Sequence, residues 1–176
     1  MPPMRFVTER LILRPWLATD EDGVISILGD PEVMAFSDQG ALDKDMRDRW
    51  LAAAIGSLQN GTTPGTLAIS SKTDDRVIGY ASLSQDLGRI GRDEIELGFR
   101  LARPAWGQGY GTEVAACIVR VAHDLMQYTR LVAIVDPNNI GSVRVLQKAG
   151  LSQIGEITFD GYDYPDHLYA FELTQP

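Results

Sequence analysis

The stretch PAWGQGYGTE, Pro104–Glu113, joins a predicted strand to a predicted amphipathic helix. Three of its residues are glycines at alternate positions, Gly107, Gly109 and Gly111. Because glycine has no Cβ, backbone amides in such a loop can approach a ligand closely. A helix that starts here directs its unpaired N–H groups and the positive end of its dipole toward the loop. The stretch therefore predicts a site for a phosphate or pyrophosphate group.

Two common phosphate-binding sequences do not fit this loop. A nucleoside-triphosphate loop ends in Gly-Lys-Ser/Thr, whereas this stretch contains no lysine. A dinucleotide loop needs glycines at its first, third and sixth positions, but the sixth position is Thr112 counted from Gly107 and Val114 counted from Gly109. A tight strand-to-helix connection without any ligand stays open at this point, so the rest of the chain must decide.

The composition is that of an ordinary globular protein, with 44% hydrophobic and 23% charged residues. A length of 176 residues is enough for one domain with a substantial core, which we place at 1–176. The net charge of −8 argues against nucleic acid or an anionic membrane as the main partner. No apolar run reaches the roughly 18–20 residues that span a bilayer, and the opening residues lack an apolar signal-peptide centre. We expect a cytoplasmic protein.

Hydrophobic periodicity predicts an α/β protein with a mixed sheet flanked by helices, in the order β-α-α-β-β-β-α-β-α-β-β. Strands are expected at residues 9–16, 66–71, 76–84, 94–102, 131–135, 152–159 and 167–174. Thr19 and Asp22 are spaced as in a helix-starting capping box, and that short helix would end near residues 29–31. A second helix is expected at about 42–58, where Met46, Trp50, Ala54 and Leu58 repeat every four residues.

The helix after the glycine loop is expected to bury one face. That face carries Val114, Cys117, Ile118, Val121 and Leu125. A last helix, at about 140–148, would stop at Gly150, which suits a left-handed cap. Cys117 is the only cysteine, so no internal disulfide or cysteine-based metal cluster can form.

Three segments resemble the GNAT family of N-acetyltransferases. The glycine loop matches the family pattern Gln/Arg-x-x-Gly-x-Gly/Ala at Gly109 and Gly111, with Trp106 at the Gln/Arg position. DPNNIGSVRVLQKAGL, Asp136–Leu151, resembles a second signature, Asn-x-x-Ser near a helix start and Lys-x-Gly-Phe at its end, with leucine replacing the phenylalanine. TERLILRP, Thr8–Pro15, together with WGQGYGTE, resembles the branch that acetylates the N-termini of ribosomal proteins, the RimJ/RimL type.

This resemblance implies direct transfer of an acetyl group from acetyl-coenzyme A, the cosubstrate, to a primary amine, without an acyl-enzyme. Cys117 would then be a core residue. The resemblance of EIELGF to a family segment that often carries a catalytic glutamate implies Glu96 as the general base, with Glu94 as the substitute. Ser142 would be the acid that assists the leaving thiolate. An ordinary surface glutamate and a serine that only bonds backbone are the alternatives for these positions.

The resemblance also implies the coenzyme A site. A backbone N–H near Leu101, where the family strand bulges and splays from its neighbour, would hold the acetyl carbonyl. The residues expected to bind coenzyme A are Leu101, Ala102 and Arg103 beside the pantetheine arm, Gln108, Gly109, Tyr110, Gly111 and Thr112 at the pyrophosphate, and Asn139. Asn139 would hold the arm or cap the helix. Arg103, Arg144 and Lys148 are possible phosphate cations or solvated surface charges.

The acceptor implied by the resemblance is the N-terminal α-amine of a protein. A small amine (a polyamine or aminoglycoside) and a non-catalytic acyl-coenzyme A-binding role are the alternatives. Phe36, Tyr162 and Tyr164 could line an acceptor groove. His123 and His167 stand apart without other ligands, so we expect no metal site, and no nicotinamide cofactor. A homodimer is left open.

Overall fold

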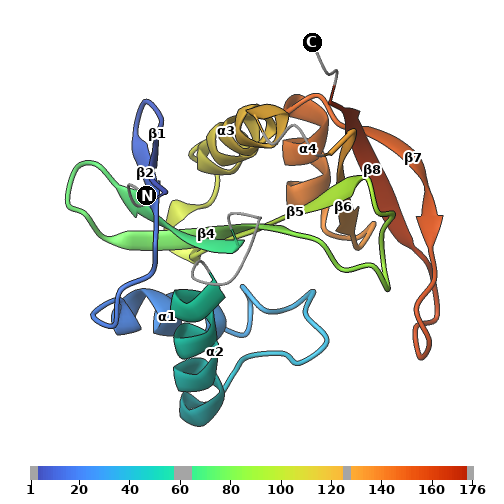
Figure 1. Cartoon of the computed structure of the whole chain (residues 1–176). Helices are drawn as coiled ribbons and strands as arrows, with labels where there is room; N and C mark the ends of the chain where they lie inside the picture. The colour runs from blue at the N-terminus through green and yellow to red at the C-terminus, as the bar shows by residue number, and fades with distance from the viewer. Residues whose placement is uncertain (1–3, 58–64, 125–127, 174–176) are drawn as a thin grey trace.

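The computed structural model describes residues 4–57, 65–124 and 128–173, which form a sheet of eight strands between two pairs of helices (Figure 1). The strands are β1 (Phe6–Val7), β2 (Leu11–Arg14), β3 (Gly65–Ser71), β4 (Val77–Ser84), β5 (Glu94–Leu101), β6 (Arg130–Val135), β7 (Ser152–Ile157) and β8 (Asp166–Glu172). Their order across the sheet is β1-β2-β3-β4-β5-β6-β8-β7. Every neighbouring pair is antiparallel except β5 and β6, which are parallel.

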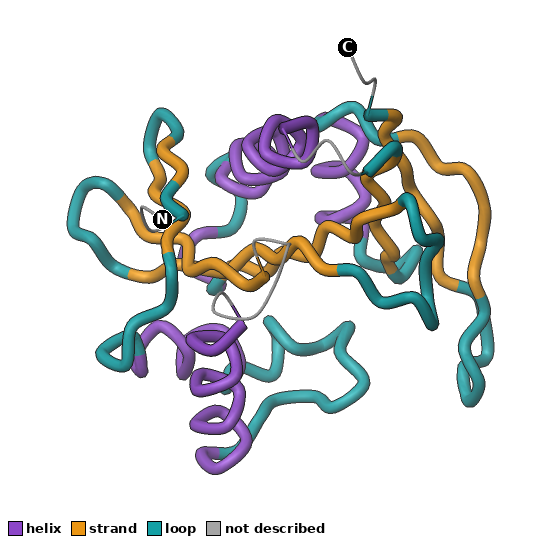
Figure 2. The backbone as a smooth tube through the Cα atoms, in the orientation of Figure 1, coloured by secondary structure: helices purple, strands orange, loops and turns teal. Residues whose placement is uncertain are grey.

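The helices lie on both faces of the sheet, as Figure 2 shows. On one face lie α1 (Glu21–Leu28) and α2 (Lys44–Ser57), and on the other α3 (Tyr110–Asp124) and α4 (Ile140–Lys148). A short 3₁₀ turn, η1 (Arg103–Ala105), connects β5 to α3. The glycine loop thus lies where β5 ends and α3 begins, at one edge of the helical layer.

The alternation of side chains along the strands divides the core into two layers. In β5, Ile95, Leu97 and Leu101 point toward α3 and are buried there with Val114 and Ile118. Each such side chain contributes roughly 1.5–3 kcal/mol when fully buried. A second cluster lies between α1, α2 and the opposite face of the sheet. The residues of β5 between the buried ones, Glu96 among them, face this second side.

The predicted mixed α/β fold is confirmed, with every expected helix and strand present near its expected position. The last helix has its predicted bounds, and Gly150 behind it adopts a left-handed φ of 94°. Cys117 is a buried core residue, as expected. The two-residue strand β1 and the turn η1 were not expected, since so few residues produce no periodic signal.

The start of α1 differs from the capping box expected at Thr19 and Asp22. The N-cap is Asp20, and its side chain makes no capping bond. Its carboxylate instead accepts hydrogen bonds from two guanidinium nitrogens of Arg14, at 2.8 and 3.0 Å, and from the N–H of Leu17 at 2.8 Å. A guanidinium, which offers two charge-assisted bonds, is a stronger partner than one helix amide.

The expected four-residue repeat of α2 is only partly a buried stripe. Ala54 is buried, whereas Met46 and Trp50 are half-buried against the second cluster. The fourth member, Leu58, lies outside the described residues, as does Leu125 of the stripe expected on α3.

The turn between β1 and β2 is joined to α3 by a cluster around Glu113. Its Oε1 accepts from the Thr8 hydroxyl at 2.5 Å and from the Arg10 N–H at 2.8 Å, and its Oε2 accepts from Arg10 Nε at 2.8 Å. The Arg10 guanidinium also donates to the Gln108 carbonyl at 2.9 Å and lies 4.4 Å from the ring centroid of Tyr110. We call these contacts the Glu113 brace. They tie the segment TERLILRP to the glycine loop.

The brace should contribute to stability in a pH-dependent way. Partial burial alone would raise the pKa of Glu113, but hydrogen bonds from Thr8 and Arg10 outweigh it, so the pKa is lowered. The contribution is therefore present at neutral pH and is lost as the pH falls through that lowered pKa. We expect Glu113→Gln to reduce the free energy of unfolding by about 1–2 kcal/mol at pH 7. The loss is smaller than that of a fully buried hydrogen bond to a charged group, because the Arg10 side chain is 42% exposed and solvent screens the interaction.

Urea denaturation between pH 3 and pH 8 measures this effect. Asp48→Asn is the matched control, since it removes the carboxylate from an exposed ion pair with Lys44 that should contribute little. Equal unfolding free energies for the two variants over the whole pH range would contradict the role of the brace.

Candidate active site

The parallel contact between β5 and β6 is short. It covers the pairs Glu94–Arg130, Ile95–Leu131 and Glu96–Val132, beyond which the register ends within the described residues. The remainder of β5, up to Leu101, stays paired with β4. The strand therefore has one satisfied edge and one edge turned toward a gap in the sheet.

The backbone groups on the open edge can be assigned from the hydrogen-bond alternation of antiparallel strands. The N–H of Ala102 donates to the Ile78 carbonyl at 2.8 Å, which fixes the phase of the β4–β5 ladder. The N–H and C=O groups of Leu97, Phe99 and Leu101 consequently point away from β4. The Glu96–Val132 pairing uses the N–H of Leu97, so the groups that face the gap are the C=O of Leu97 and the N–H and C=O groups of Phe99 and Leu101. The bulge expected near Leu101 is absent from the one-to-one β4–β5 register, but the expected splay is present between β5 and β6.

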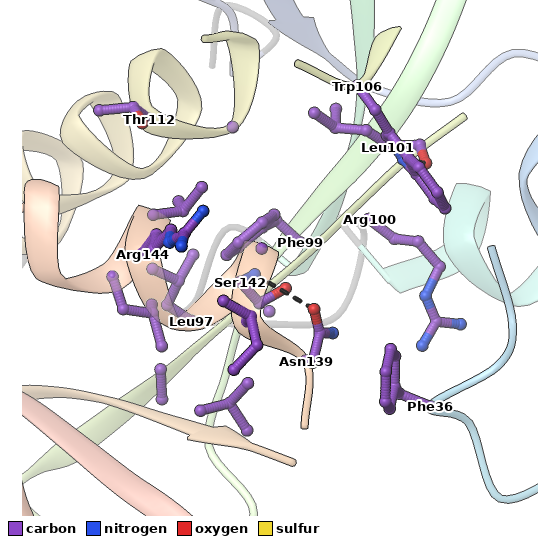
Figure 3. Close-up of a pocket in the computed structure, with 18 of the residues that line it drawn as sticks. Phe36, Leu97, Phe99, Arg100, Leu101, Trp106, Thr112, Asn139, Ser142 and Arg144 are labelled. Carbon is purple, nitrogen blue, oxygen red and sulfur yellow. Dashed lines mark hydrogen bonds between the residues drawn. The ribbon is translucent and has the colours of Figure 1, made fainter. Parts of the chain in front are cut away.

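A cleft of about 800 Å³ lies at this gap and reaches both faces of the sheet (Figure 3). Its lining includes Gly109 from the loop before α3 and Ser142 from α4 on one side. On the other side it includes Glu96 and Arg100 from β5, and Phe36 from the loop after α1. A molecule in the cleft can therefore contact the start of α3 and the α1–α2 side at once.

The three glycines of this loop have two different structural roles. Gly107 and Gly109 have φ values of 72° and 80°, a region that other residues rarely adopt. Gly111 lies inside α3, where a Cβ would come within 3.0 Å of Val145 Cγ2, so this glycine lets α3 and α4 pack closely. Trp106 lies half-exposed at the cleft, and its Nε1 donates to the Leu101 carbonyl at 2.8 Å.

The second signature forms the start of α4. Asn139 is the N-cap, and its side-chain oxygen accepts the N–H of Ser142 at 3.1 Å (Figure 3). The cap satisfies a helix amide that otherwise has no partner. Asn139 and Ser142 both line the cleft, so the first turn of α4 faces the open edge of β5.

Glu96 combines burial with access to the cleft. Its side chain is 13% exposed, and one carboxylate oxygen lies 3.6 Å from Arg89 Nη2. Burial raises the pKa of Glu96, the nearby Asp86 adds to the rise, and the positive charge of Arg89 only partly opposes it. A carboxylate with a raised pKa binds a proton more readily, which suits a general base.

Glu94, the alternative base, has a different environment. Its Oε2 accepts from the Gly91 N–H at 2.8 Å and its Oε1 accepts from Arg130 Nη1 at 3.2 Å. Glu94 does not appear in the lining of the cleft. The geometry therefore favours Glu96 over Glu94 as the group that can reach a ligand.

Most residues expected to bind coenzyme A come together here, and three do not. Those in the cleft lining are Leu101, Gly109, Tyr110, Gly111, Thr112 and Asn139. Ala102 is buried in the α1–α2 cluster. Gln108 donates from its side-chain amide to the Pro104 carbonyl at 2.6 Å, outside the cleft. Arg103 also lies outside it.

Of the three expected phosphate cations, one lies outside the cleft and two line it. Arg103 bonds Asp30 at 2.7 Å and Glu32 at 2.8 Å, so its charge is already matched by two carboxylates. Arg144 and Lys148 are exposed and line the cleft from α4. They are the better placed of the three for a polyanionic ligand.

Sequence reasoning missed the open-edge residues Leu97 and Phe99, and also Arg100. The signal was present in EIELGFRL, because strict alternation places Leu97, Phe99 and Leu101 on one phase and Glu96 and Arg100 on the other. What the sequence did not contain was where β6 would stop pairing with β5.

The other candidate residues lie at the margins or in the core. Tyr164 donates to Asp136 at 2.8 Å, and both Tyr162 and Tyr164 are exposed on the β7–β8 connection. Burial raises the pKa of the Cys117 thiol, which agrees with a core role. Among the described residues, no three histidine, cysteine or acidic side chains gather as metal ligands would, and no helix could cross a membrane.

Comparison with known proteins assigns the family. The model of the acetyltransferase (GNAT) domain matches residues 10–152. This chain belongs to the GNAT family. The N-acetyltransferase p20 of Bacillus licheniformis is 26% identical over 151 residues, which cover 84% of this chain and 82% of that protein.

Solved structures agree on the fold. A GNAT-family acetyltransferase from Bacillus anthracis superposes with a TM-score of 0.84 at 20% identity, covering 97% of this chain and 99% of that one. The microcin C7 self-immunity acetyltransferase MccE, solved with acetyl-coenzyme A and AMP, gives 0.78 at 15% identity, covering 98% and 97%. A Vibrio cholerae protein provisionally described as a ribosomal-protein-serine acetyltransferase gives 0.75 at 15%, covering 98% and 99%.

The chain is therefore an acetyltransferase that uses acetyl-coenzyme A, and the residues present fit that cosubstrate. The start of α3 offers free amides beside glycines with left-handed φ values, which suit a pyrophosphate. The open edge of β5 offers backbone donors and acceptors to an amide-containing arm. The cleft volume of about 800 Å³ lies within the range of small-molecule sites.

A Gly109→Val substitution should weaken coenzyme A binding, because a β-branched residue disfavours the φ of 80° and its side chain blocks the loop amides. We expect a loss of about 1–3 kcal/mol, the cost of leaving polar groups unpaired, measured by calorimetry. Gly161→Val is the matched control, since Gly161 has a φ of 90° in the β7–β8 connection and open space around it. Normal coenzyme A affinity in a folded Gly109→Val protein would remove the loop from the site.

Proposed function

We propose that this acetyltransferase acts in the cytoplasm on the N-terminal α-amine of a protein. The observation that carries the proposal is the cleft through the sheet, which connects the glycine loop on one face with Glu96 on the other. The segments TERLILRP and WGQGYGTE, which resemble the ribosomal-protein-acetylating branch, support the choice of acceptor. The Glu113 brace joins these two segments physically.

Glu96 acts as the general base in this proposal. The amine nitrogen attacks the acetyl carbon, the carbon–sulfur bond breaks, and the proton released by the amine passes to the Glu96 carboxylate directly or through water. The raised pKa of Glu96 supports this role, because it brings the carboxylate closer to the pKa of an α-amine, about 8.

Ser142 and the Leu101 N–H donate hydrogen bonds to the other two atoms that gain negative charge, the thioester sulfur and the acetyl carbonyl oxygen. The hydroxyl of Ser142, on the first turn of α4, donates to the departing thiolate, which has an ordinary pKa of about 8.5 and needs only a nearby donor. The N–H of Leu101 faces the gap and is available to the acetyl carbonyl oxygen. The Trp106 indole, bonded to the Leu101 carbonyl, holds this end of β5 in place.

The shape of the acceptor side supports an extended acceptor. The loop after α1 places Phe36 at the cleft, and its ring is 47% exposed, so the cleft is open to solvent at this residue. A peptide N-terminus needs such an open approach, whereas a compact amine is held best by a closed acidic pocket.

A small amine is the second candidate. An aminoglycoside acetyltransferase solved with coenzyme A is also a structural neighbour, with a TM-score of 0.71 at 17% identity over 92% of this chain. At that identity the likeness concerns the fold alone, and the acceptor must be decided by assay.

Glu96→Gln should lower kcat/KM by roughly 10²–10⁴-fold at neutral pH, the usual effect of losing a general base. The wild-type rate should rise through the raised pKa of Glu96, and the deficit of the variant should shrink at high pH, where more amine is already neutral. Steady-state rates from pH 6 to pH 9.5, read by thiol release, measure both effects.

One control and one stability measurement accompany that experiment. Glu94→Gln removes a carboxylate two residues away on the same strand face but outside the cleft, and should leave a far higher rate than Glu96→Gln does.

Burial disfavours the ionised form of Glu96, so the free energy of unfolding falls as the pH rises through the raised pKa of this group. Glu96→Gln should therefore raise Tm near pH 8. Full turnover by Glu96→Gln at neutral pH would exclude Glu96 as the base.

The acceptor can be identified by comparing kcat/KM for short peptides with free and blocked N-termini, spermidine and an aminoglycoside. We expect peptides with a free α-amine to react best and blocked peptides not to react. A tenfold or greater preference for a small amine, about 1.4 kcal/mol in transition-state free energy, would reassign the acceptor.

A further inference from the structure

The acceptor side of the cleft holds an arginine whose hydrogen-bonding capacity is largely unused. Arg100 is half-buried on β5, on the same strand face as Glu96. Within the described residues, no carboxylate oxygen lies within 4.0 Å of its guanidinium, in contrast to the guanidinium groups of Arg103 and Arg130. One guanidinium nitrogen contacts the sulfur of Met34, and a thioether is a weak acceptor.

The surroundings of Arg100 are apolar and aromatic rather than acidic. Its side chain extends from β5 toward the ring of Phe36 in Figure 3. It also lies near Tyr80, where burial raises the pKa of the phenol and the positive charge of Arg100 opposes the rise. Glu32 lines the same cleft, but Arg103 already binds its carboxylate at 2.8 Å. A guanidinium kept in such a place favours an anionic partner from outside the chain.

The spacing between Arg100 and Glu96 defines what could bridge them. The two residues are four apart on one strand, so their Cα atoms are about 13 Å apart. Gly98 lies between them on the same face, and the small hydroxyl side chain of Ser82 lies 2.6 Å from where its Cβ would be, so no large side chain fills the interval. An extended peptide covers about 3.3 Å per residue, and the arginine side chain shortens the distance further. An amine held at Glu96 would place the second to fourth residues of a peptide within reach of Arg100.

We propose that Arg100 is a specificity-determining residue that binds a carboxylate of the acceptor, carried by an aspartate or glutamate at the second to fourth position of the peptide. A guanidinium presents its donors in a fixed fork that matches both oxygens of a carboxylate. The inference rests on the proposed N-terminal acceptor and narrows it to acidic N-terminal segments. Coenzyme A does not use Arg100 in this assignment, because the glycine loop and the open edge of β5 lie on other sides of the strand.

The test compares matched peptides with free N-termini that differ only in Asp against Asn, or Glu against Gln, at positions two to four. Wild-type protein should acetylate an acidic peptide about tenfold or more faster in kcat/KM than its amide counterpart at one of these positions. Arg100→Gln should remove that preference while leaving the rate on the amide peptide and the Kd of acetyl-coenzyme A close to wild type. Arg100→Lys, which keeps the charge but loses the fork, should keep part of the preference.

Arg49→Gln is the matched control, since it removes an exposed positive charge on α2 away from the cleft and should behave as wild type. A wild-type protein with no acid preference, or an Arg100→Gln protein that keeps it or slows equally on both peptides, would overturn the proposal. If Arg100→Gln is unfolded by circular dichroism, Arg100→Lys carries the comparison.

Failure of the proposed acceptor has a separate signature. If no peptide reacts, the N-terminal assignment is wrong and the acidic-peptide proposal falls with it. The role of Arg100 itself is then decided with ω-amino acids against the matching alkylamines. A carboxylate preference among these that Arg100→Gln removes would retain Arg100 as the carboxylate-binding residue, and an unchanged preference would reject it.

Discussion

The parallel pairing of β5 with β6 ends at Glu96 and Val132, and the site depends on that separation. Backbone N–H and C=O groups need partners, so a strand that loses its neighbour offers a row of groups to a ligand. The open edge at Leu97, Phe99 and Leu101 is therefore both a cost to the fold and the surface on which an extended cosubstrate can lie. The same separation opens the cleft between the two helical layers.

Several contacts keep the walls of this opening in place. The Glu113 brace attaches the start of α3 to the turn between β1 and β2, and Gly111 allows α4 to pack directly against α3. The Asn139 cap fixes the first turn of α4, and the Trp106 indole bonds the last carbonyl of β5. These contacts involve α3, α4 and β5, so helices and a strand, and not loops alone, support the rim of the cleft. Such support is what a site needs to keep its geometry.

Sequence analysis predicted the layered α/β fold, the glycine loop and the helix start at Asn139, because each has a strong local signal in periodicity, glycine spacing or capping. It predicted less well where long-range partners decide. Arg103 was expected at coenzyme A but is bound to Asp30 and Glu32, which lie more than seventy residues earlier in the chain. The role of Gly111 in packing required Val145, and the difference between Glu94 and Glu96 required Arg130 and the end of β6. None of these partners can be read from local sequence.

Residue-resolved amide hydrogen exchange, measured by NMR with and without acetyl-coenzyme A, tests the central claim most directly. If the open edge of β5 and the start of α3 hold the cosubstrate, the amides of Phe99, Leu101 and residues 107–112 should gain protection on binding. The amides of Gly98 and Arg100, which face β4, should exchange slowly in both states. Binding that leaves the first set unchanged, or that protects only residues away from the gap, would contradict the account.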